Sequence, residues 1–442
     1  MGFMKRNMII LAVTLVAITA SASHTLTDGR LISHTNSIYP GTERTFQVYV
    51  PDQYDGTREA CLYIGLDGVL CNAPAVMDSL INCGKMPVTI GVFLQPGTIK
   101  DAQGNVLRYN RSNEFDATDA TFARFLETEL LPEIEEMQTP DGKPIRLSHR
   151  GCDHMIFGLS SGGIAAFTAA WHRPDLFGRV FSGVGTFVAM RGGNDLQAIV
   201  RKSEPRPIKI FLQDGSNDAW NPLFGHWYEG NRMLATALEF AGYDCRFDWS
   251  DGAHNVKRSS EIFADVMTWM WSDWPNITTG TTQNDMLSQL LITGEDWKAT
   301  AASYSDIDPC KTAFYPDGAL MAAAEPGTNY LWQYIVDNNQ LKDGQRFYWL
   351  HNYDNSAVTV SAMAFDGNGN LWVVTNAGIQ ICDQNGRVRG IITLPCDASR
   401  VQGIIIADNR VTLVTTGSED YTRRFNVPAP KPGERPKSQG QG

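Results

Sequence analysis

The sequence has no excess of basic residues. Its 442 residues include 37 Lys and Arg against 48 Asp and Glu, which gives a formal net charge of −11. Proteins that bind nucleic acids or anionic membranes do so through clustered Lys and Arg side chains. We therefore predict neither a nucleic acid nor a membrane as a partner.

The sequence also has few long hydrophobic runs. Its most apolar stretch, residues 8–18, is only about a dozen residues long, whereas a membrane-spanning helix needs roughly 20. Lys5 and Arg6 precede this stretch and Ala20-Ser21-Ala22 follows it, which is the arrangement of a signal peptide and its cleavage site. We predict a signal peptide over residues 1–22 and a mature protein that is secreted or periplasmic.

A cysteine pattern of the zinc-binding type is missing as well. The spacing of the cysteines matches no zinc motif, and we expect neither a metal ion nor a cofactor. Export would permit disulfides, and the pairing that we predict is Cys71 with Cys83. The eight cysteines are Cys61, Cys71, Cys83, Cys152, Cys245, Cys310, Cys382 and Cys396.

Strands and helices alternate through the first part of the chain. Alternation of this kind is typical of a mainly parallel, doubly wound sheet with helices on both faces. We therefore predict an α/β domain over residues 23–274. Hydrophobic periodicity predicts strands over 44–50, 61–66, 88–93, 154–157, 180–182, 208–213 and 245–249, and helices over 117–136, 163–171, 231–241 and 260–271.

The pattern changes after residues 275–285, which are rich in Thr and Asn and are predicted to form a linker. The segment AFYPDGAL at 313–320 recurs as AFDGNGNL at 364–371, and 370–375 is similar to 410–415. Repeats of roughly 40 to 50 residues are typical of propeller blades, but a closed propeller needs about four or more blades. We predict a small β-rich domain of incomplete, propeller-like blades over 286–426, and a disordered Pro-rich tail over 427–442.

An incomplete set of blades leaves unpaired strand edges and an unclosed apolar face. We therefore expect residues 286–426 to pack against the first domain or against a second chain, as in a dimer.

The strongest chemical signal is the segment Gly158-Leu159-Ser160-Ser161-Gly162, which lies between a predicted strand and a predicted helix. In that context G-x-S-x-G forms a nucleophile elbow, because small residues on both sides of the serine permit the sharp turn that exposes its hydroxyl. We predict Ser160 as the nucleophile. Ser161 is the other candidate, but it stands one position further on.

A serine nucleophile needs a base to take its proton and an acid to orient that base. His254 follows the last predicted strand and is the predicted base. The strand at 208–213 leads into Asp214 and Asp218, and we favour Asp218 because it lies further out on the loop. The order Ser160, Asp218, His254 is the order found in α/β-hydrolases.

The tetrahedral intermediate of ester hydrolysis needs hydrogen-bond donors for its oxyanion. We expect one donor to be the backbone N–H of Ser161. The second is expected in the turn after the strand at 61–66, from either Gly68 or Val69.

Together these motifs resemble the esterase D-type α/β-hydrolases, which group with carbohydrate esterase family 1 and with siderophore trilactone esterases. The resemblance covers about residues 35–274 and implies ester hydrolysis through an acyl-serine. Asp67, Arg111 and Glu114 match family positions beside the site, where they contact substrate or form a loop-anchoring ion pair. The segments that carry the resemblance, besides the elbow, are 39–44, 48–51, 67–68, 111–116, 129–132 and 251–254.

A second resemblance covers residues 311–416, which are similar to blades of the gluconolactonase and regucalcin propellers. The segments GNLWVVT at 369–375 and GIQICD at 378–383 carry it. The metal ligands of that family are spread over a complete ring, so we transfer no ligand and no lactonase activity to this chain.

The first resemblance implies an esterase that removes feruloyl or acetyl groups from plant cell-wall polysaccharide such as xylan. Trp220 and Trp227 are the aromatic side chains that we expect to face a sugar or phenolic ring. A siderophore trilactone esterase would use the same triad but would need cationic residues around its cleft, because the iron complex is anionic. An alternative of another class is a non-catalytic protein that binds glycan.

Overall fold

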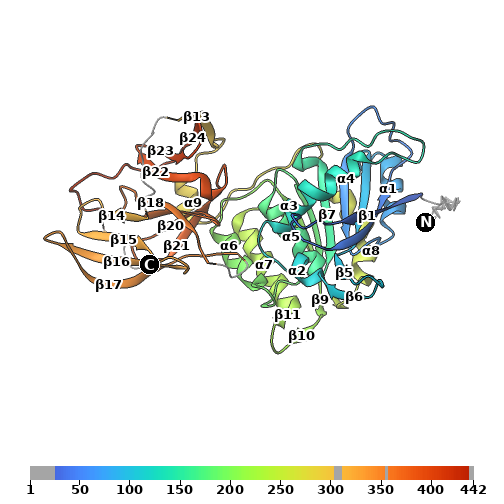
Figure 1. The fold of residues 1–442 in the computed structure, drawn as a ribbon, viewed down its shortest axis with the longest axis horizontal. Helices are drawn as coiled ribbons and strands as arrows, with labels where there is room; N and C mark the ends of the chain where they lie inside the picture. The colour runs from blue at the N-terminus through green and yellow to red at the C-terminus, as the bar shows by residue number, and fades with distance from the viewer. Residues whose placement is uncertain (1–24, 303–310, 354–356, 438–442) are drawn as a thin grey trace, which may run out of the picture.

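The computed structural model describes residues 25–302, 311–353 and 357–437. Figure 1 shows two lobes, the first built on one large sheet and the second on three small sheets. The predicted signal peptide lies outside the described residues. Among the residues that are described, no helix is both long and apolar enough to cross a membrane.

A ten-stranded sheet forms the core of the first lobe. Its strands are β1 (Leu26–Ile32), β2 (Glu43–Tyr49), β3 (Cys61–Leu66), β4 (Thr89–Leu94), β5 (Thr98–Lys100), β6 (Val106–Tyr109), β7 (His154–Leu159), β8 (Arg179–Gly183), β9 (Lys209–Asn217) and β12 (Asp244–Ala253). The order is β12-β9-β8-β7-β3-β4-β2-β5-β6, with β1 paired to β2. The strands from β12 to β4 are parallel, which confirms the predicted mainly parallel α/β sheet.

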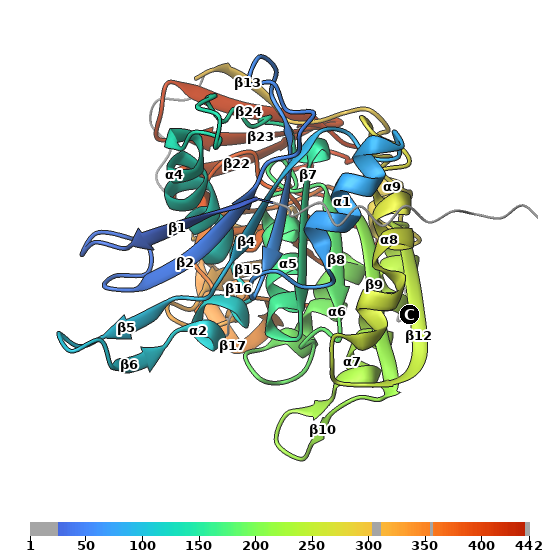
Figure 2. The same cartoon turned by 90° about the vertical axis from the view of Figure 1, so that its right-hand side faces the viewer.

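Helices cover both faces of this sheet. On one face, α1 and α8 bury side chains such as Met77 and Phe263 against Tyr63 and Phe157 of the strands, and Figure 2 shows these two helices together. Helices α3 to α7 cover the other face. Because both faces are covered, β3, β4, β7 and β8 are buried at every residue. The helices are α1 (Ala73–Asn82), α2 (Arg111–Phe115), α3 (Thr121–Phe125), α4 (Leu131–Glu136), α5 (Ser161–His172), α6 (Leu196–Lys202), α7 (Trp227–Ala241) and α8 (Lys257–Met270).

The helix predicted over 117–136 begins later, at Thr121, and is not uniform. A π-helical turn, Leu126–Leu130, separates α3 from α4. Pro132 follows that turn and has no backbone N–H, so it cannot donate the hydrogen bond that a regular α-helix needs there.

The predicted disulfide between Cys71 and Cys83 is wrong, because both cysteines are free. They flank opposite ends of α1, whose ten residues rise about 15 Å. The Cα atoms of a disulfide lie within about 7 Å of each other. Cys310 lies outside the described residues.

The second lobe consists of three antiparallel sheets of four strands each. The first sheet holds β14 (Thr312–Phe314), β15 (Leu320–Ala324), β16 (Tyr330–Asp337) and β17 (Gln340–Trp349). The second holds β18 (Val360–Phe365), β19 (Leu371–Thr375), β20 (Gly378–Cys382) and β21 (Val388–Ile392). The third holds β22 (Val401–Ala407), β23 (Arg410–Thr415), β24 (Glu419–Arg424) and, at its edge, β13 (Lys298–Ala301) from before the first sheet.

The sequence repeats fall at equivalent places in these sheets. Segments 313–320 and 364–371 each join the first strand of a sheet to its second, and 370–375 and 410–415 coincide with the second strands β19 and β23. Strand β18 contacts both β14 and β22, so the first strands of the three sheets are neighbours. The structure therefore has a separate β-rich region, while its kinship with gluconolactonases stays a prediction.

Residues 275–284 connect the lobes without regular structure, and a short helix, α9 (Asp285–Leu290), begins at the last residue of the predicted linker. The prediction of a disordered tail is wrong for residues 427–437. Val427 is buried, and the carbonyl oxygen of Pro428 accepts a hydrogen bond from Gly367 N at 2.9 Å. Proline lacks a donor but keeps its carbonyl acceptor, so Pro-rich chain can still be held by its neighbours.

The second lobe packs against the first, as predicted. Glu204, which follows α6, donates its backbone N–H to the carbonyl oxygen of Ile391 on β21 at 2.9 Å. Its carboxylate accepts from Arg423 Nη2 at 2.5 Å. The indole Nε1 of Trp171 donates to the hydroxyl of Tyr353 at 3.1 Å. A dimer stays a prediction.

Candidate active site

Ser160 occupies the turn between β7 and α5. Its φ of 58° and ψ of −121° lie outside the regions that L-residues favour, at a cost of about 1 to 3 kcal/mol. The turn is so tight that a Cβ on Gly158 would lie 2.2 Å from the carbonyl oxygen of Gly162. Only glycine fits at that position, which explains why the motif places small residues around the serine.

The three residues predicted as a triad meet at the carboxyl ends of β7, β9 and β12. His254 Nε2 lies 2.8 Å from Ser160 Oγ, and His254 Nδ1 lies 2.5 Å from Asp218 Oδ1. The side chain of Asp218 is fully buried, whereas that of His254 is 32% exposed. The arrangement connects a buried carboxylate, through an imidazole, to a serine hydroxyl at the edge of the sheet.

Asp214, the alternative acid, does not contact His254 but is hydrogen-bonded to Asp218. It is fully buried, and Asn231 Nδ2 donates to its Oδ2 at 2.7 Å. Asp218 Oδ2 is buried and accepts from no N–H or hydroxyl group in the described part of the chain. The structure therefore places Asp214 behind the acid and not beside the base.

The two carboxyl groups have opposite pKa shifts. Burial and the hydrogen bond to Asp218 raise the pKa of Asp214 to about 9, so this carboxyl is neutral at pH 7. Burial alone would raise the pKa of Asp218, but hydrogen bonds from His254 and Asp214 outweigh it and lower that pKa. The two shifts differ in direction because both groups are buried but only Asp218 is paired with His254.

One of the two alternative oxyanion donors is already engaged. The backbone N–H of Gly68 donates to the carbonyl oxygen of Leu94 at 3.2 Å, so Gly68 is not free for this role. Val69 is exposed, and its N–H has no acceptor among the described residues. Ser161 begins α5, where N–H groups have no partner within the helix. Val69 and Ser161 are therefore the available donors.

Asp67 and Arg111 form an ion pair with each other. Arg111 Nε and Nη2 each lie 2.7 Å from a carboxylate oxygen of Asp67, and Nη2 also donates to the carbonyl oxygen of Leu159 at 3.3 Å. Leu159 directly precedes Ser160, so the pair ties the turn after β3 to the serine elbow. This is the loop-anchoring role, while substrate contact by this partly exposed pair stays a prediction.

Of the two roles predicted for Glu114, substrate contact is wrong, whereas it does form an ion pair, with Arg44. Its carboxylate is fully buried and accepts from Arg44 Nη1 at 2.7 Å and Nη2 at 3.0 Å. The N–H of Gly97 donates to it as well, at 3.2 Å. Glu114 therefore fixes the loop that precedes α2 from inside the protein.

Trp227 is also misplaced by the prediction, because it is buried and does not face a ligand. Its ring lies edge to face with that of His254, with centroids 6.0 Å apart. Its Nε1 donates to Thr186 Oγ1 at 3.2 Å, and Thr186 Oγ1 lies 3.4 Å from Ser160 Oγ. Sequence reasoning missed Thr186, although its place just after β8, between the strands of the triad, was a usable signal.

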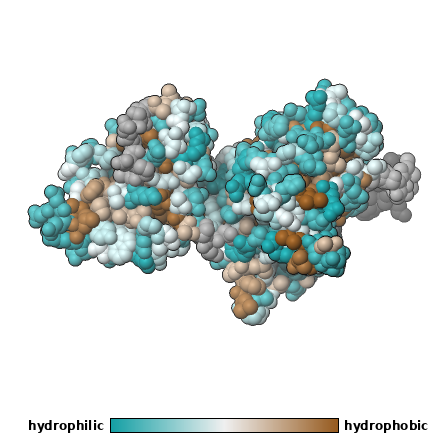
Figure 3. All heavy atoms as spheres, in the orientation of Figure 1, coloured by the Kyte–Doolittle hydropathy of each residue, from teal (hydrophilic) through white to brown (hydrophobic). Residues whose placement is uncertain are grey.

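Trp220, in contrast, is exposed, as a substrate contact requires. It lies on a hairpin of two short strands, β10 (Trp220–Asn221) and β11 (Gly225–His226), whose connection exposes Leu223. A second hairpin, β5–β6, exposes Leu107 and Tyr109. Both hairpins project from the lower side of the sheet in Figure 2, and Figure 3 shows hydrophobic surface on each.

The described residues offer no metal site at this edge or elsewhere. No group of three or more His, Cys, Asp and Glu side chains within them is arranged to hold an ion.

A family comparison fits this geometry. The model of the Esterase family, described as "Putative esterase", matches residues 37–260, just over half of the chain. The chain belongs to the Esterase family. The matched residues include Ser160, Asp218 and His254. A search of curated proteins finds no match to the chain.

Several solved structures are similar to this chain over a little more than half of its length. The enterobactin esterase FES from Shigella flexneri in the presence of enterobactin is 19% identical with a TM-score of 0.44, over 57% of this chain and 60% of that one. A ferulic acid esterase is 19% identical with a TM-score of 0.41, over 56% and 98%. An IroE-like serine hydrolase from Shewanella oneidensis is 18% identical with a TM-score of 0.40, over 56% and 81%. This esterase thus spans 60% of the length of the enterobactin esterase.

Proposed function

We propose that the protein is a secreted serine esterase that removes feruloyl or acetyl groups from plant cell-wall polysaccharide such as xylan. The observation that supports this proposal most strongly is the hydrogen-bonded chain from Asp218 through His254 to Ser160, at a strained elbow. A buried acid, an imidazole and an exposed serine turn are what acyl transfer through a serine requires.

In the acylation step, Ser160 Oγ bonds to the carbonyl carbon of the ester while His254 Nε2 takes the hydroxyl proton. Asp218 keeps His254 in the tautomer that carries its proton on Nδ1. The carbonyl oxygen becomes an oxyanion and accepts hydrogen bonds from the N–H groups of Ser161 and Val69. His254 then returns the proton to the alcohol oxygen, which leaves, and Ser160 remains acylated.

In the deacylation step, a water molecule gives a proton to His254 and attacks the acyl carbon. Collapse of the second tetrahedral intermediate releases the carboxylic acid, and His254 returns its proton to Ser160 Oγ. Asp214, as a neutral acid, donates to Asp218 throughout and holds its carboxylate toward His254. The chain thus supplies every proton transfer that the reaction needs.

The choice of substrate is supported by the side chains around the site. Trp220 and Tyr109 expose aromatic surface on the two hairpins, which suits a phenolic acyl group or a sugar ring. Arg111, the cation predicted beside the site, is neutralised by Asp67. A neutral acylated polysaccharide fits this surface better than the anionic iron complex of a trilactone siderophore does.

The experiment is a substrate screen with methyl ferulate, acetylated xylan and a catecholate trilactone, with Ser160→Ala as the inactive control. We expect turnover of methyl ferulate or acetylated xylan by the wild type alone. Activity confined to the trilactone would overturn the polysaccharide assignment. The absence of a burst or turnover with any activated ester would overturn esterase activity itself and favour the non-catalytic, glycan-binding alternative.

A further inference from the structure

The first sheet of the second lobe exposes aromatic side chains on one face. Residues at alternate positions of a strand share a face, as do directly paired residues of neighbouring strands. Strand β16 contributes three such side chains. Strand β17 pairs with β16 and adds a fourth, and β14 adds a fifth through Met321 of β15, which pairs with both β14 and β16. We call this surface the aromatic face; its residues are Phe314, Tyr330, Trp332, Tyr334 and Trp349.

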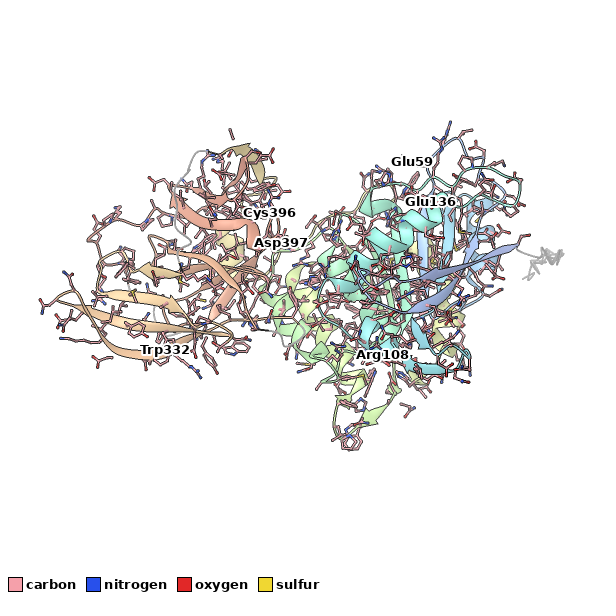
Figure 4. All side chains as sticks on the ribbon, in the orientation of Figure 1. Glu59, Arg108, Glu136, Trp332, Cys396 and Asp397 are labelled. Carbon is pink, nitrogen blue, oxygen red and sulfur yellow. The ribbon has the colours of Figure 1, made fainter. Side chains whose placement is uncertain are left out.

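The opposite face of the same sheet is packed into the lobe. Leu331 and Tyr348 alternate with the aromatic residues and are buried with Phe365 and Leu371 of the second sheet. On the aromatic face, Phe314, Tyr330 and Trp349 are exposed and Trp332 and Tyr334 are half-buried. Figure 4 labels Trp332 on the lower margin of this lobe. Exposed patches of this kind mark interaction sites more often than chance.

The rings of the aromatic face are held in fixed orientations. Trp332 Nε1 donates to Glu325 Oε2 at 2.7 Å, and the same carboxylate accepts from Arg346 Nε at 2.8 Å. The Arg346 guanidinium in turn lies 5.0 Å from the ring centre of Tyr330. This chain of contacts fixes the rings before any ligand binds, which lowers the entropy lost on binding.

Trp332 and Tyr334 also lie close to each other on the aromatic face, and both are half-buried. Trp332 and Tyr334 are nearly parallel, with an angle of 20° and centroids 6.0 Å apart. A Cβ on Gly344 would lie 2.3 Å from the ring of Tyr334, so this ring lies flat against the glycine backbone. Gly344 thus leaves room for the ring of Tyr334, which a side chain at this position would displace.

We propose that the aromatic face binds a neutral polysaccharide chain by stacking sugar rings on Trp332 and Tyr334. The apolar C–H faces of pyranose rings match flat aromatic surfaces in size and polarity. Two ion pairs border the face, Glu325 with Arg346 and Asp337 with Lys342, so these four charges largely cancel and a neutral ligand suits the face better than a charged one. The choice of polysaccharide rests on the proposed function, which places acylated xylan at the other lobe.

The test measures binding of xylan that has been stripped of its acyl groups, by affinity electrophoresis of the full chain carrying Ser160→Ala. We expect Trp332→Ala and Tyr334→Ala each to weaken binding about tenfold, the typical effect of losing one stacking contact. Trp332→Phe keeps a ring and should lose much less. Ile335→Ala is the matched control, because Ile335 is exposed on the same strand but points to the opposite face.

Two further measurements separate the possible outcomes. Turnover of methyl ferulate by Trp332→Ala in the otherwise wild-type chain should equal that of the wild type, and melting temperatures should show that the variants are folded. Xylan binding that depends on Trp332 in a chain without esterase activity would support the aromatic face while overturning the proposed function. Xylan binding unaffected by both Trp332→Ala and Tyr334→Ala would overturn the proposal, as would a dimer in sedimentation that Trp332→Ala dissociates.

Discussion

In the first lobe, the buried carboxyl groups of Asp214 and Asp218 lie in line with His254 and Ser160. In the second lobe, the buried carboxylate of Asp366 serves its own turn: it accepts from the N–H groups of Asn368 and Asn370, each at 2.9 Å. The same residue type thus orients a catalytic base in one lobe and a β-turn in the other.

The comparison shows that burial of an acid does not by itself indicate chemistry. Asp366 also accepts from Trp372 Nε1 at 3.0 Å, and Asp383 accepts from the N–H of Asn385 at 2.9 Å in the next hairpin. Among the described residues, each of these acids has donors from within its own hairpin alone. Asp218 differs because one of its donors, His254, follows another strand and has a second ring nitrogen within hydrogen-bond distance of the half-buried Ser160.

The largest expected effect comes from Ser160→Ala. Loss of the nucleophile should lower kcat on methyl ferulate by at least about three orders of magnitude, without unfolding either lobe. Steady-state kinetics measure the activity, and circular dichroism shows whether both lobes stay folded. Retained activity would contradict the assignment of Ser160 as the nucleophile.

The next largest effect separates the two acids of the first lobe. Asp218→Asn should lower kcat by about two to three orders of magnitude, because an amide does not hold the imidazole in its working tautomer. Asp214→Asn should cost less than about tenfold, since an amide still donates to Asp218 as the neutral acid does. The reverse ranking in kinetics would assign the acid role to Asp214.

Stability against pH tests the protonation state of Asp214. The folded protein keeps this proton up to about pH 9, whereas the unfolded chain loses it near the ordinary value of 3.8. Between these values the folded state binds more protons, so this group lowers stability as pH rises, by up to about 1.4 kcal/mol per pH unit. Urea denaturation at pH 5 and pH 8 measures the free energy of unfolding. The difference between Asp214→Asn and the wild type in this free energy should shift in favour of the variant at pH 8. An equal difference at both pH values would show that Asp214 is ionised.

Asp366→Ala tests the structural use of an acid in the second lobe. The substitution leaves two backbone N–H groups and the Trp372 indole without their acceptor, and we expect a loss of about 2 to 4 kcal/mol in unfolding free energy. Activity on methyl ferulate should change by less than about twofold, because no contact of Asp366 reaches the site. A large loss of activity in folded protein would contradict the view that the buried acid of the second lobe has a structural role alone.

The smallest effect is expected for Trp227→Phe. The ring still packs on His254, but the hydrogen bond to Thr186 is lost, so kcat/KM should fall about three- to tenfold. Thr186→Val removes the same hydrogen bond from the other side and should give a similar decrease. If kcat/KM of the double variant fell by the product of the two single decreases, the two residues would act independently and not through this contact.

Much of the first lobe was predictable because its central strands are buried on both faces. The strand predicted over 61–66 coincides with β3, and the predicted 154–157 lies within β7. The edge elements β1, β5 and β6 were not predicted, because their side chains are largely exposed and show no apolar alternation. Helix α1 was also missed. It ends at Asn82, and Gly84, two positions later, is a common signal for the end of a helix.

The site residues were predictable where their order in the chain and the local turn determine their positions. Ser160 and His254 follow from the elbow and from the position after the last strand. The partner of Glu114 was not predictable, because Arg44 is 70 positions away and only the folded sheet brings them together. Asn231, which positions Asp214, belongs to α7 and carries no motif of its own.

Covalent labelling tests the central claim most directly. The wild type, Ser160→Ala and Ser161→Ala are each treated with a fluorophosphonate or an activated ester, and the adduct is located by peptide mass spectrometry. The account predicts one adduct, on Ser160, in the wild type and in Ser161→Ala, and none in Ser160→Ala. An adduct on Ser161, or equal labelling of the Ser160→Ala variant, would contradict it.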